Sequence, residues 1–182
     1  LSGGRVELGL GVGWMREEFD ALGVPWEKRG ARNDEYIEAM RALWQGPHAE
    51  YHGDFVDFEP ATCSPRPVNG SIPIIVGGDS DAAISRAVRI ADGYFPGEGD
   101  IAQLGALLNR VRQAAEAAGR DPASIEFSAI FGSQMANPEQ GVEEMASIGV
   151  DRIMVPAFFF GGPDGLDNLD QLSERIMPIA NG

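Results

Sequence analysis

A glycine-rich turn in the middle of the chain has the residue types that bind a phosphate group. It consists of Gly77, Gly78, Asp79 and Ser80. The apolar run 73–77 predicts a buried strand before it, and apolar spacing predicts a helix over about 81–91 after it. Backbone N–H groups at the start of a helix favour anions, and glycine lets an anion approach them. An ordinary strand-to-helix turn capped by Ser80 is the alternative, because Asp79 and Asp81 would repel a phosphate unless they turned away.

A second glycine-rich stretch, residues 5–19, predicts a strand with one apolar face and one bare face. Its apolar residues are Val6, Leu8, Leu10 and Val12, which alternate with Gly9, Gly11 and Gly13. Glycine weakens a strand but leaves backbone that a ring or a phosphate can approach closely. We therefore expect a buried strand that ends at a ligand, or else glycines that merely fit a crowded barrel interior. The stretch is not a dinucleotide-binding fingerprint, because the third glycine spacing is absent and no helix is predicted directly after it.

Other reactive side chains form weaker patterns. Glu17 and Glu18 are adjacent, so they cannot face each other across a substrate, and a solvated helix start is the alternative. His48 and His52 lie four residues apart across a predicted loop and strand, which does not predict a metal site. The aromatic run 158–160 could form the floor of a pocket or fill the core. No catalytic residue is assigned from these patterns.

The segments between the two glycine-rich stretches predict a helix and a hairpin. Residues 13–30 are expected to be a turn region, and apolar spacing predicts a helix from about residue 33 to 44. Residues 49–58 predict a hairpin around a Gly-Asp turn. Residues 60–73 contain four prolines and predict an irregular connection. The stretch at about 47–72 is thus an expected hairpin and loop insertion, of the kind that can cover a site.

The second half of the chain alternates between strands and helices. Further strands are predicted at 93–96, 125–131 and 152–156, and the pair Asp100 and Gln103 predicts a capped helix start. The strand–helix rhythm recurs about five times along the chain, which favours an α/β fold with a parallel sheet. A complete eight-stranded barrel needs at least about 200 residues. At 182 residues, the chain predicts either an open sheet or most of a barrel without its first strands.

Composition and charge limit which binding partners and which cellular compartment are expected for the chain. The formal net charge of −14 disfavours nucleic acid and anionic membranes as partners. No apolar run is long enough to cross a membrane, and no signal peptide is recognised. The one cysteine, Cys63, cannot form an internal disulfide, which fits a reducing cytoplasm. The chain starts without methionine, so we expect it to be a piece of something longer.

Several motifs together resemble the luciferase-like monooxygenase superfamily, and its coenzyme F420-dependent oxidoreductases in particular. The first runs Gly-Arg-Val-Glu-Leu-Gly-Leu-Gly-Val-Gly-Trp over 4–14, with Glu-Glu-Phe at 17–19. The second is Pro-Ile-Ile-Val-Gly-Gly-x-Ser at 73–80, with Ala-Asp-Gly-Tyr at 91–94. The resemblance implies a (β/α)8 TIM-barrel type fold. Residues 1–182 would then form one barrel domain that lacks the first three strands. Such an open barrel has bare strand edges, which favour a homodimer or larger assembly.

The resemblance also implies a cofactor site at the C-terminal ends of the strands. The phosphate of a deazaflavin or flavin would lie on Gly77 and Gly78, with Asp79 and Ser80 adjoining. The ring would pass Gly11, Val12 and Gly13, with Trp14 next to them. In the family's sugar-phosphate dehydrogenases a glutamate that acts as an acid follows this Gly-x-Gly. Trp14 stands there in this chain, so no catalytic residue is transferred.

The activity that the resemblance implies is hydride transfer between coenzyme F420 and a small organic substrate of unknown identity. A monooxygenase of the same fold that depends on flavin mononucleotide (FMN) is the first alternative. A non-catalytic barrel fragment that serves as an assembly or binding module is the second. In cofactor chemistry of this kind the protein holds the ring, orients the substrate and excludes water.

Overall fold

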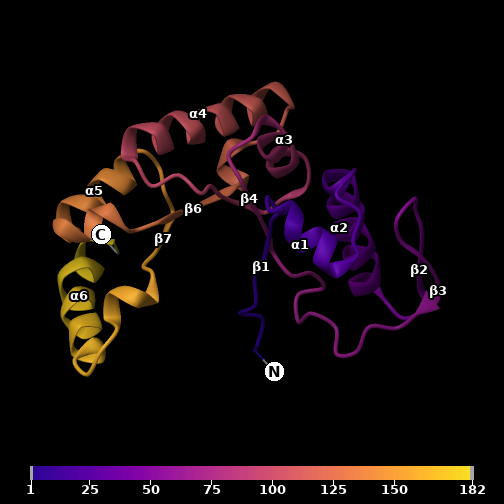
Figure 1. Ribbon diagram of the computed structural model, residues 1–182, viewed down its shortest axis with the longest axis horizontal. Helices are drawn as coiled ribbons and strands as arrows, with labels where there is room; N and C mark the ends of the chain where they lie inside the picture. Colours follow the sequence, from indigo (N-terminus) through magenta and orange to yellow (C-terminus); the bar gives the residue numbers. More distant parts are fainter. Residues whose placement is uncertain (1, 181–182) are drawn as a thin grey trace. The chain divides into compact units, whose positions relative to one another are not determined.

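A computed structural model describes residues 2–180, which divide after Val76 into two compact units. Both units combine parallel strands with helices, so the predicted α/β class is confirmed (Figure 1). The interpretation of residues 1–182 as one barrel domain with an insertion at about 47–72 stays a prediction. Among the described residues, no helix combines the length and the hydropathy needed to cross a bilayer.

The first unit pairs its first and last strands in parallel. Its elements are β1 (Leu8–Leu10), α1 (Arg16–Leu22), α2 (Arg29–Gln45), β2 (Ala49–His52), β3 (Asp57–Ala61) and β4 (Ile74–Gly77), whose last residue begins the second unit. Leu8 lies opposite Ile74, and Leu10 lies opposite Val76. Ile74 and Val76 are buried, in agreement with the predicted strand. The predicted helix is also confirmed, although α2 begins at Arg29, four residues before the expected start.

The expected buried strand over the first glycine-rich stretch is wrong in two respects. Only Leu8–Leu10 form a strand, and none of these residues is buried. Val6, expected on the apolar face, is 49% exposed. Glycine has low strand propensity, and the positive φ of Gly13 (+79°) takes the backbone out of the extended conformation.

The prediction of a turn region over 13–30 is also wrong, because α1 lies inside it. This helix has no buried residue, so no apolar repeat marks it in the sequence. Its first turn carries Glu17 and Glu18, which interact favourably with the positive end of the helix dipole. Gly23 ends it in the left-handed conformation (φ +66°). The C-terminal glycine cap and the acidic first turn therefore favour α1, and neither feature is part of an apolar pattern.

The predicted hairpin is confirmed, and a carboxylate on α2 holds its turn. β2 and β3 pair in antiparallel fashion. Glu35 accepts backbone N–H bonds from Asp54, Phe55 and Val56 at 3.1, 2.6 and 2.6 Å. The Tyr51 ring also stacks on the Phe58 ring, with centroids 6.3 Å apart. The hairpin is thus attached to α2 by hydrogen bonds to the tip of its loop.

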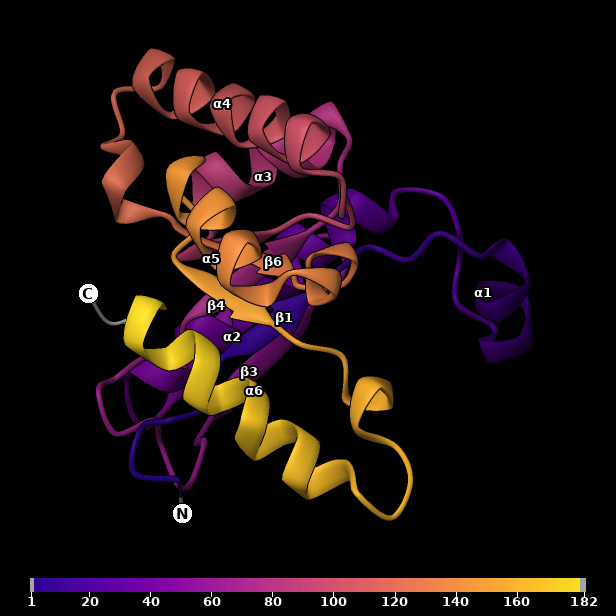
Figure 2. The same cartoon turned by 90° about the vertical axis from the view of Figure 1, so that its left-hand side faces the viewer.

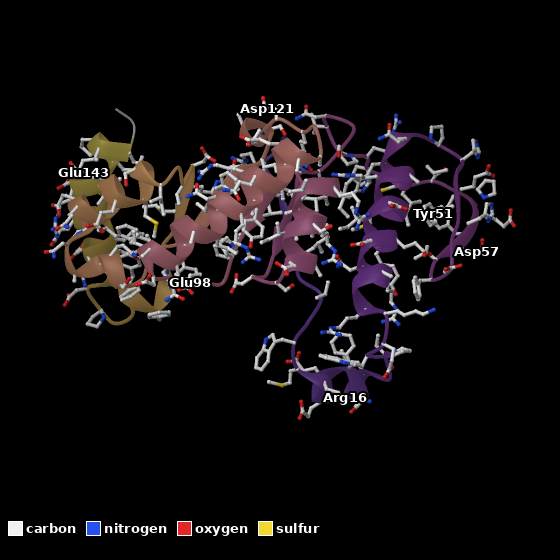
Figure 3. The ribbon with its side chains drawn as sticks, turned by 90° about the horizontal axis from the view of Figure 1, so that it is seen from above. Arg16, Tyr51, Asp57, Glu98, Asp121 and Glu143 are labelled. Atoms are coloured by element: carbon white, nitrogen blue, oxygen red, sulfur yellow. The ribbon has the colours of Figure 1, made fainter. Side chains whose placement is uncertain are left out.

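The pair His52 and Asp57 joins the two strands of the hairpin on its exposed surface. Figure 3 labels Asp57 at the start of β3, and its Oδ1 lies 2.6 Å from His52 Nδ1. This hydrogen bond raises the pKa of His52 above its usual value of 6.5. A raised pKa in the folded state stabilises the fold below the unfolded pKa, and the contribution is lost as pH rises through the folded pKa. We expect Asp57→Asn to lower the pKa of His52 toward 6.5, as measured by titration of the imidazole protons in nuclear magnetic resonance (NMR). Identical titration curves for both proteins would contradict this account.

The second unit repeats a strand–helix pattern. Its elements are α3 (Asp81–Ile90), β5 (Gly93–Phe95), α4 (Ile101–Ala117), β6 (Glu126–Ile130), α5 (Pro138–Ser147), β7 (Arg152–Met154) and α6 (Gly165–Ala180), with 3-10 turns at Pro122–Ser124, Ser133–Ala136 and Ala157–Phe160. β5, β6 and β7 pair in parallel in that order. Figure 2 shows α3 beside α4, and α5 lies against α6. Each predicted strand and helix of this half is confirmed within a few residues.

The core of the second unit is formed by helix and strand residues with almost no exposed surface. It includes Tyr94, Leu104, Leu108, Val111, Ile125, Phe131 and Met145. The predicted cap of α4 is present, because the Asp100 side chain accepts the Gln103 N–H bond at 3.0 Å. The reciprocal acceptor is not Gln103. Glu98, labelled in Figure 3, accepts the Asp100 N–H bond at 2.8 Å.

Candidate functional site

The turn at 77–80 joins the end of β4 to the start of α3, as the sequence predicts. Gly78 has a φ of +110°, and a Cβ at this position would lie 3.3 Å from the Cβ of Ala83. The Ser80 hydroxyl accepts the Ala83 N–H bond at 3.2 Å, so the expected serine cap is present. Glycine at position 78 is therefore required by the backbone conformation, and the helix start is well formed.

Both acidic residues near the turn are engaged by other groups. Asp79 Oδ1 accepts the Gly97 N–H bond at 2.9 Å. Asp81 forms an ion pair with Arg110. An anion at the turn would therefore meet carboxylates that are already hydrogen-bonded or paired, and the Arg110 guanidinium reduces the local negative charge.

Donor groups remain available at the turn. Gly78, Asp79 and Ser80 are exposed. Among the hydrogen bonds of residues 2–180, none is donated by the backbone N–H of Asp79, Asp81 or Ala82. Such N–H groups at the start of a helix carry a partial positive charge and point outward. The turn thus has the free donors that a phosphate site requires.

A cleft of about 300 Å³ adjoins the turn within the second unit. Its lining residues are Asp79, Glu98, Gln103, Ala106, Leu107 and Arg110. The Glu98 carboxylate is used at the cap of α4, where it accepts N–H bonds from Gly99 and Asp100 at 2.8 Å each. Arg110 is therefore the one cationic residue among those that line the cleft. The cleft thus offers space for a ligand and one positive charge close to the turn.

The residues Gly11–Trp14 belong to the first unit and follow β1. A Cβ at Gly11 would meet no atom within 4 Å, so the backbone there is open. Val12 is half-buried. Trp14 is 81% exposed. This open backbone suits the close approach of a ring, and the assignment of these residues to ring binding stays a prediction.

Gly13 is explained by packing inside the first unit. Its Cβ would lie 2.5 Å from the Phe19 ring, so that ring requires a glycine here. The Phe19 ring meets the Trp26 ring edge-on, with centroids 5.1 Å apart. The Arg29 guanidinium lies 3.7 Å above the Trp26 ring, and its Nε donates to the Gly13 carbonyl at 3.3 Å. The close approach that the sequence predicts at this glycine is thus made by an aromatic side chain of the chain itself.

The weaker candidates have structural partners or lie on the surface. Of the two histidines, His52 pairs with Asp57 on the hairpin. The expected core or pocket role of the phenylalanine run is not supported, because Phe158 is 77% exposed and Phe159 is 38% exposed in a 3-10 turn. Glu17 and Glu18 lie in the first turn of α1, as their alternative interpretation expects.

The sequence analysis quotes Tyr94 in a family motif but gives it no role at the turn. Its hydroxyl donates to the Gly78 carbonyl oxygen at 2.7 Å. Tyr94 has no exposed surface. A tyrosine inside a short buried strand was the available signal, because a buried hydroxyl needs a partner.

The family assignment follows from comparison with known sequences. The family model of luciferase-like monooxygenases matches residues 1–173. The chain belongs to the luciferase-like monooxygenase family. An uncharacterised protein of Mycobacterium tuberculosis is 37% identical over 186 residues, which cover 97% of this chain and 62% of that protein. This luciferase-like chain therefore spans less than two thirds of the length of that relative.

Three further comparisons concern proteins with named cofactors or activities. An FMNH2-dependent dimethylsulfone monooxygenase of Pseudomonas putida is 34% identical over 123 residues, covering 65% of this chain and 34% of that protein. A coenzyme F420-dependent tetrahydromethanopterin reductase from Methanopyrus kandleri superposes with a TM-score of 0.74 at 17% identity, covering 97% of this chain and 75% of that one. A monooxygenase from Streptomyces bottropensis superposes with a TM-score of 0.75 at 21% identity, covering 97% and 69%. The predicted family and its barrel-type α/β fold are confirmed.

Proposed function

We propose that this luciferase-like chain holds the phosphate of a deazaflavin or flavin on the turn Gly77–Ser80. The observation that carries the proposal is the state of the turn's polar groups. Within residues 2–180, the N–H groups of Asp79, Asp81 and Ala82 donate no hydrogen bond, while the carboxylates of Asp79 and Asp81 bond to other groups. A phosphate can therefore meet donors without meeting an unpaired carboxylate.

The residues present fit such a group. Gly78 is exposed and has no side chain that could cover the turn, and the N–H groups of Asp79, Asp81 and Ala82 are the proposed donors. Within the first unit taken by itself, Gly11 has open backbone and Trp14 is exposed, and the family resemblance is the reason for proposing that Gly11, Val12, Gly13 and Trp14 contact the ring. When bound, the ring supplies the hydride chemistry. This chain's residues bind, orient and shield it, and the substrate is a small organic molecule.

Coenzyme F420 is the cofactor we propose first, because the glycine motifs resemble those of F420-dependent oxidoreductases. The Methanopyrus reductase, which is named for this coenzyme, shares the fold over 97% of the chain. FMN is the second candidate, since the Pseudomonas relative at 34% identity is named as FMNH2-dependent. In the second case the activity would be that of a monooxygenase.

Fluorescence titration of the 182-residue chain with coenzyme F420, run beside FMN, tests the proposal. We expect saturable binding of one cofactor in preference to the other. Riboflavin, which lacks the phosphate, is the matched control for FMN and should bind more weakly. Failure of the folded chain to bind either cofactor would contradict the proposal and favour an assembly or binding module. Sedimentation of the same sample measures the expected homo-oligomer.

A further inference from the structure

The Tyr94 hydroxyl connects β5 to the proposed phosphate turn. Tyr94 has no exposed surface, and its hydroxyl lies 2.7 Å from the Gly78 carbonyl oxygen. Burial raises the pKa of Tyr94, and the nearby Asp79 carboxylate raises it further. The hydroxyl therefore stays protonated, as a donor to the Gly78 carbonyl must be.

This hydrogen bond also sets the direction of an amide on the opposite side. The Gly78 carbonyl and the Asp79 N–H belong to one planar peptide group, and in a trans peptide they point in opposite directions. Because the carbonyl points to a fully buried tyrosine, the Asp79 N–H points away from it. Gly78 and Asp79 are exposed, so that amide is directed toward the side on which a phosphate would bind.

A second hydrogen bond holds the side chain of the same residue. The Gly97 N–H donates to Asp79 Oδ1 at 2.9 Å, two residues after β5 ends. The carboxylate is thereby held at the residues after β5, while the backbone amide is aimed by Tyr94. Together the two bonds separate the negative side chain of Asp79 from its positive backbone donor.

We propose that Tyr94 is a positioning residue, whose hydrogen bond to Gly78 aims the Asp79 amide at the cofactor phosphate. The inference rests on the proposed function, because it assigns a role within that same site. Gly78 has a φ of +110°, which glycine adopts readily because it has no side chain. A glycine peptide without this bond can rotate more freely, so the tyrosine supplies the orientation that glycine alone does not.

The variant Tyr94→Phe tests the inference, because it removes the hydroxyl and keeps the ring in the core. We measure dissociation constants for FMN and for riboflavin with the full chain. We expect the FMN constant to rise about five- to tenfold, the range for one lost hydrogen bond, and the riboflavin constant to change less than about twofold. A merely structural role would weaken both ligands alike, so the ratio of the two constants is the decisive quantity.

Tyr51→Phe is the matched control, since it also removes a hydroxyl that makes one hydrogen bond. Tyr51 donates to Glu38 at 2.9 Å, on the hairpin side of the first unit. We expect its FMN-to-riboflavin ratio to equal that of the unaltered chain. The Asp79 amide resonance of the ligand-free protein is a second readout, and it should shift in Tyr94→Phe only.

The outcomes separate this inference from the proposed function. If the unaltered chain binds FMN and riboflavin equally, the phosphate site itself is wrong, and the role of Tyr94 falls with it. If the unaltered chain prefers FMN and Tyr94→Phe keeps that preference in full, only the positioning role is overturned. Loss of the preference in Tyr94→Phe, with Tyr51→Phe unchanged, supports both.

Discussion

The variant Gly78→Val is expected to weaken FMN binding about 100-fold, which corresponds to about 2.7 kcal/mol. Two or more charge-assisted hydrogen bonds at about 1.5–3 kcal/mol each are sufficient for this loss. The valine Cβ would sit 3.3 Å from the Ala83 Cβ, in the first turn of α3. The φ of +110° also disfavours any L side chain, so the turn itself will shift. Fluorescence titration with FMN and with riboflavin measures the effect.

A second glycine in the same unit provides the control for backbone strain. Gly119 follows α4 with a φ of +72°, and a Cβ there would meet no atom within 4 Å. Gly119→Val therefore imposes a comparable conformational cost without touching the turn. We expect it to lower the melting temperature to a similar extent and to leave FMN binding unchanged. Equal losses of binding in both variants would mean that instability, rather than the phosphate site, explains the result.

The variant Arg120→Ala is expected to have the second largest effect, on stability. Arg120 donates to the carbonyl oxygens of Ala87, Val88 and Ala91 at 3.2, 2.8 and 2.7 Å. It also donates to the Ser124 carbonyl at 3.3 Å. These bonds join the C-terminal end of α3 to the segment before β6. Their removal should lower the free energy of unfolding by about 2–3 kcal/mol, as a shift in the urea midpoint.

Two further variants are compared with Arg120→Ala: one tests the arrangement of the donors, and the other is a control for the loss of an exposed arginine. Arg120→Lys keeps the charge but not the planar fork, so we expect it to recover less than half of the loss. Arg16→Ala removes an exposed arginine that lies 3.8 Å from Asp20, and we expect only a small change. Full recovery in Arg120→Lys would show that charge at the end of α3, rather than the set of carbonyl bonds, provides the stability.

The regular elements of the second unit could be predicted because packing leaves a periodic apolar pattern. Residues Leu104, Leu108 and Val111 of α4 are fully buried on one side of their helix, and the sequence repeats them at helical spacing. α1 shows the opposite case, since it buries no residue and depends on capping and charge. The length of the strand in the first glycine-rich stretch was overestimated, because the alternation of apolar residues and glycines does not reveal that the glycines shorten the strand.

The candidate site was predictable only where its residues are neighbours in the sequence. The turn 77–80 combines a strand end, two glycines and a helix cap, all of which are local features. The contacts that shape it are not local. Tyr94 and Gly97 reach Gly78 and Asp79 across 16 and 18 residues. The partner of the buried Tyr94 hydroxyl depends on how β5 and α3 pack, and the spacing of residues in the sequence does not predict it.

Amide chemical shifts during titration with FMN test the central claim most directly. In ¹H–¹⁵N spectra of the 182-residue chain, we predict that the resonances of Asp79, Asp81 and Ala82 move progressively and saturate with the binding curve. Riboflavin at the same concentration should leave these three amides almost unmoved, because it carries no phosphate. FMN binding that saturates while the three amides keep their shifts would contradict the account and place the phosphate elsewhere.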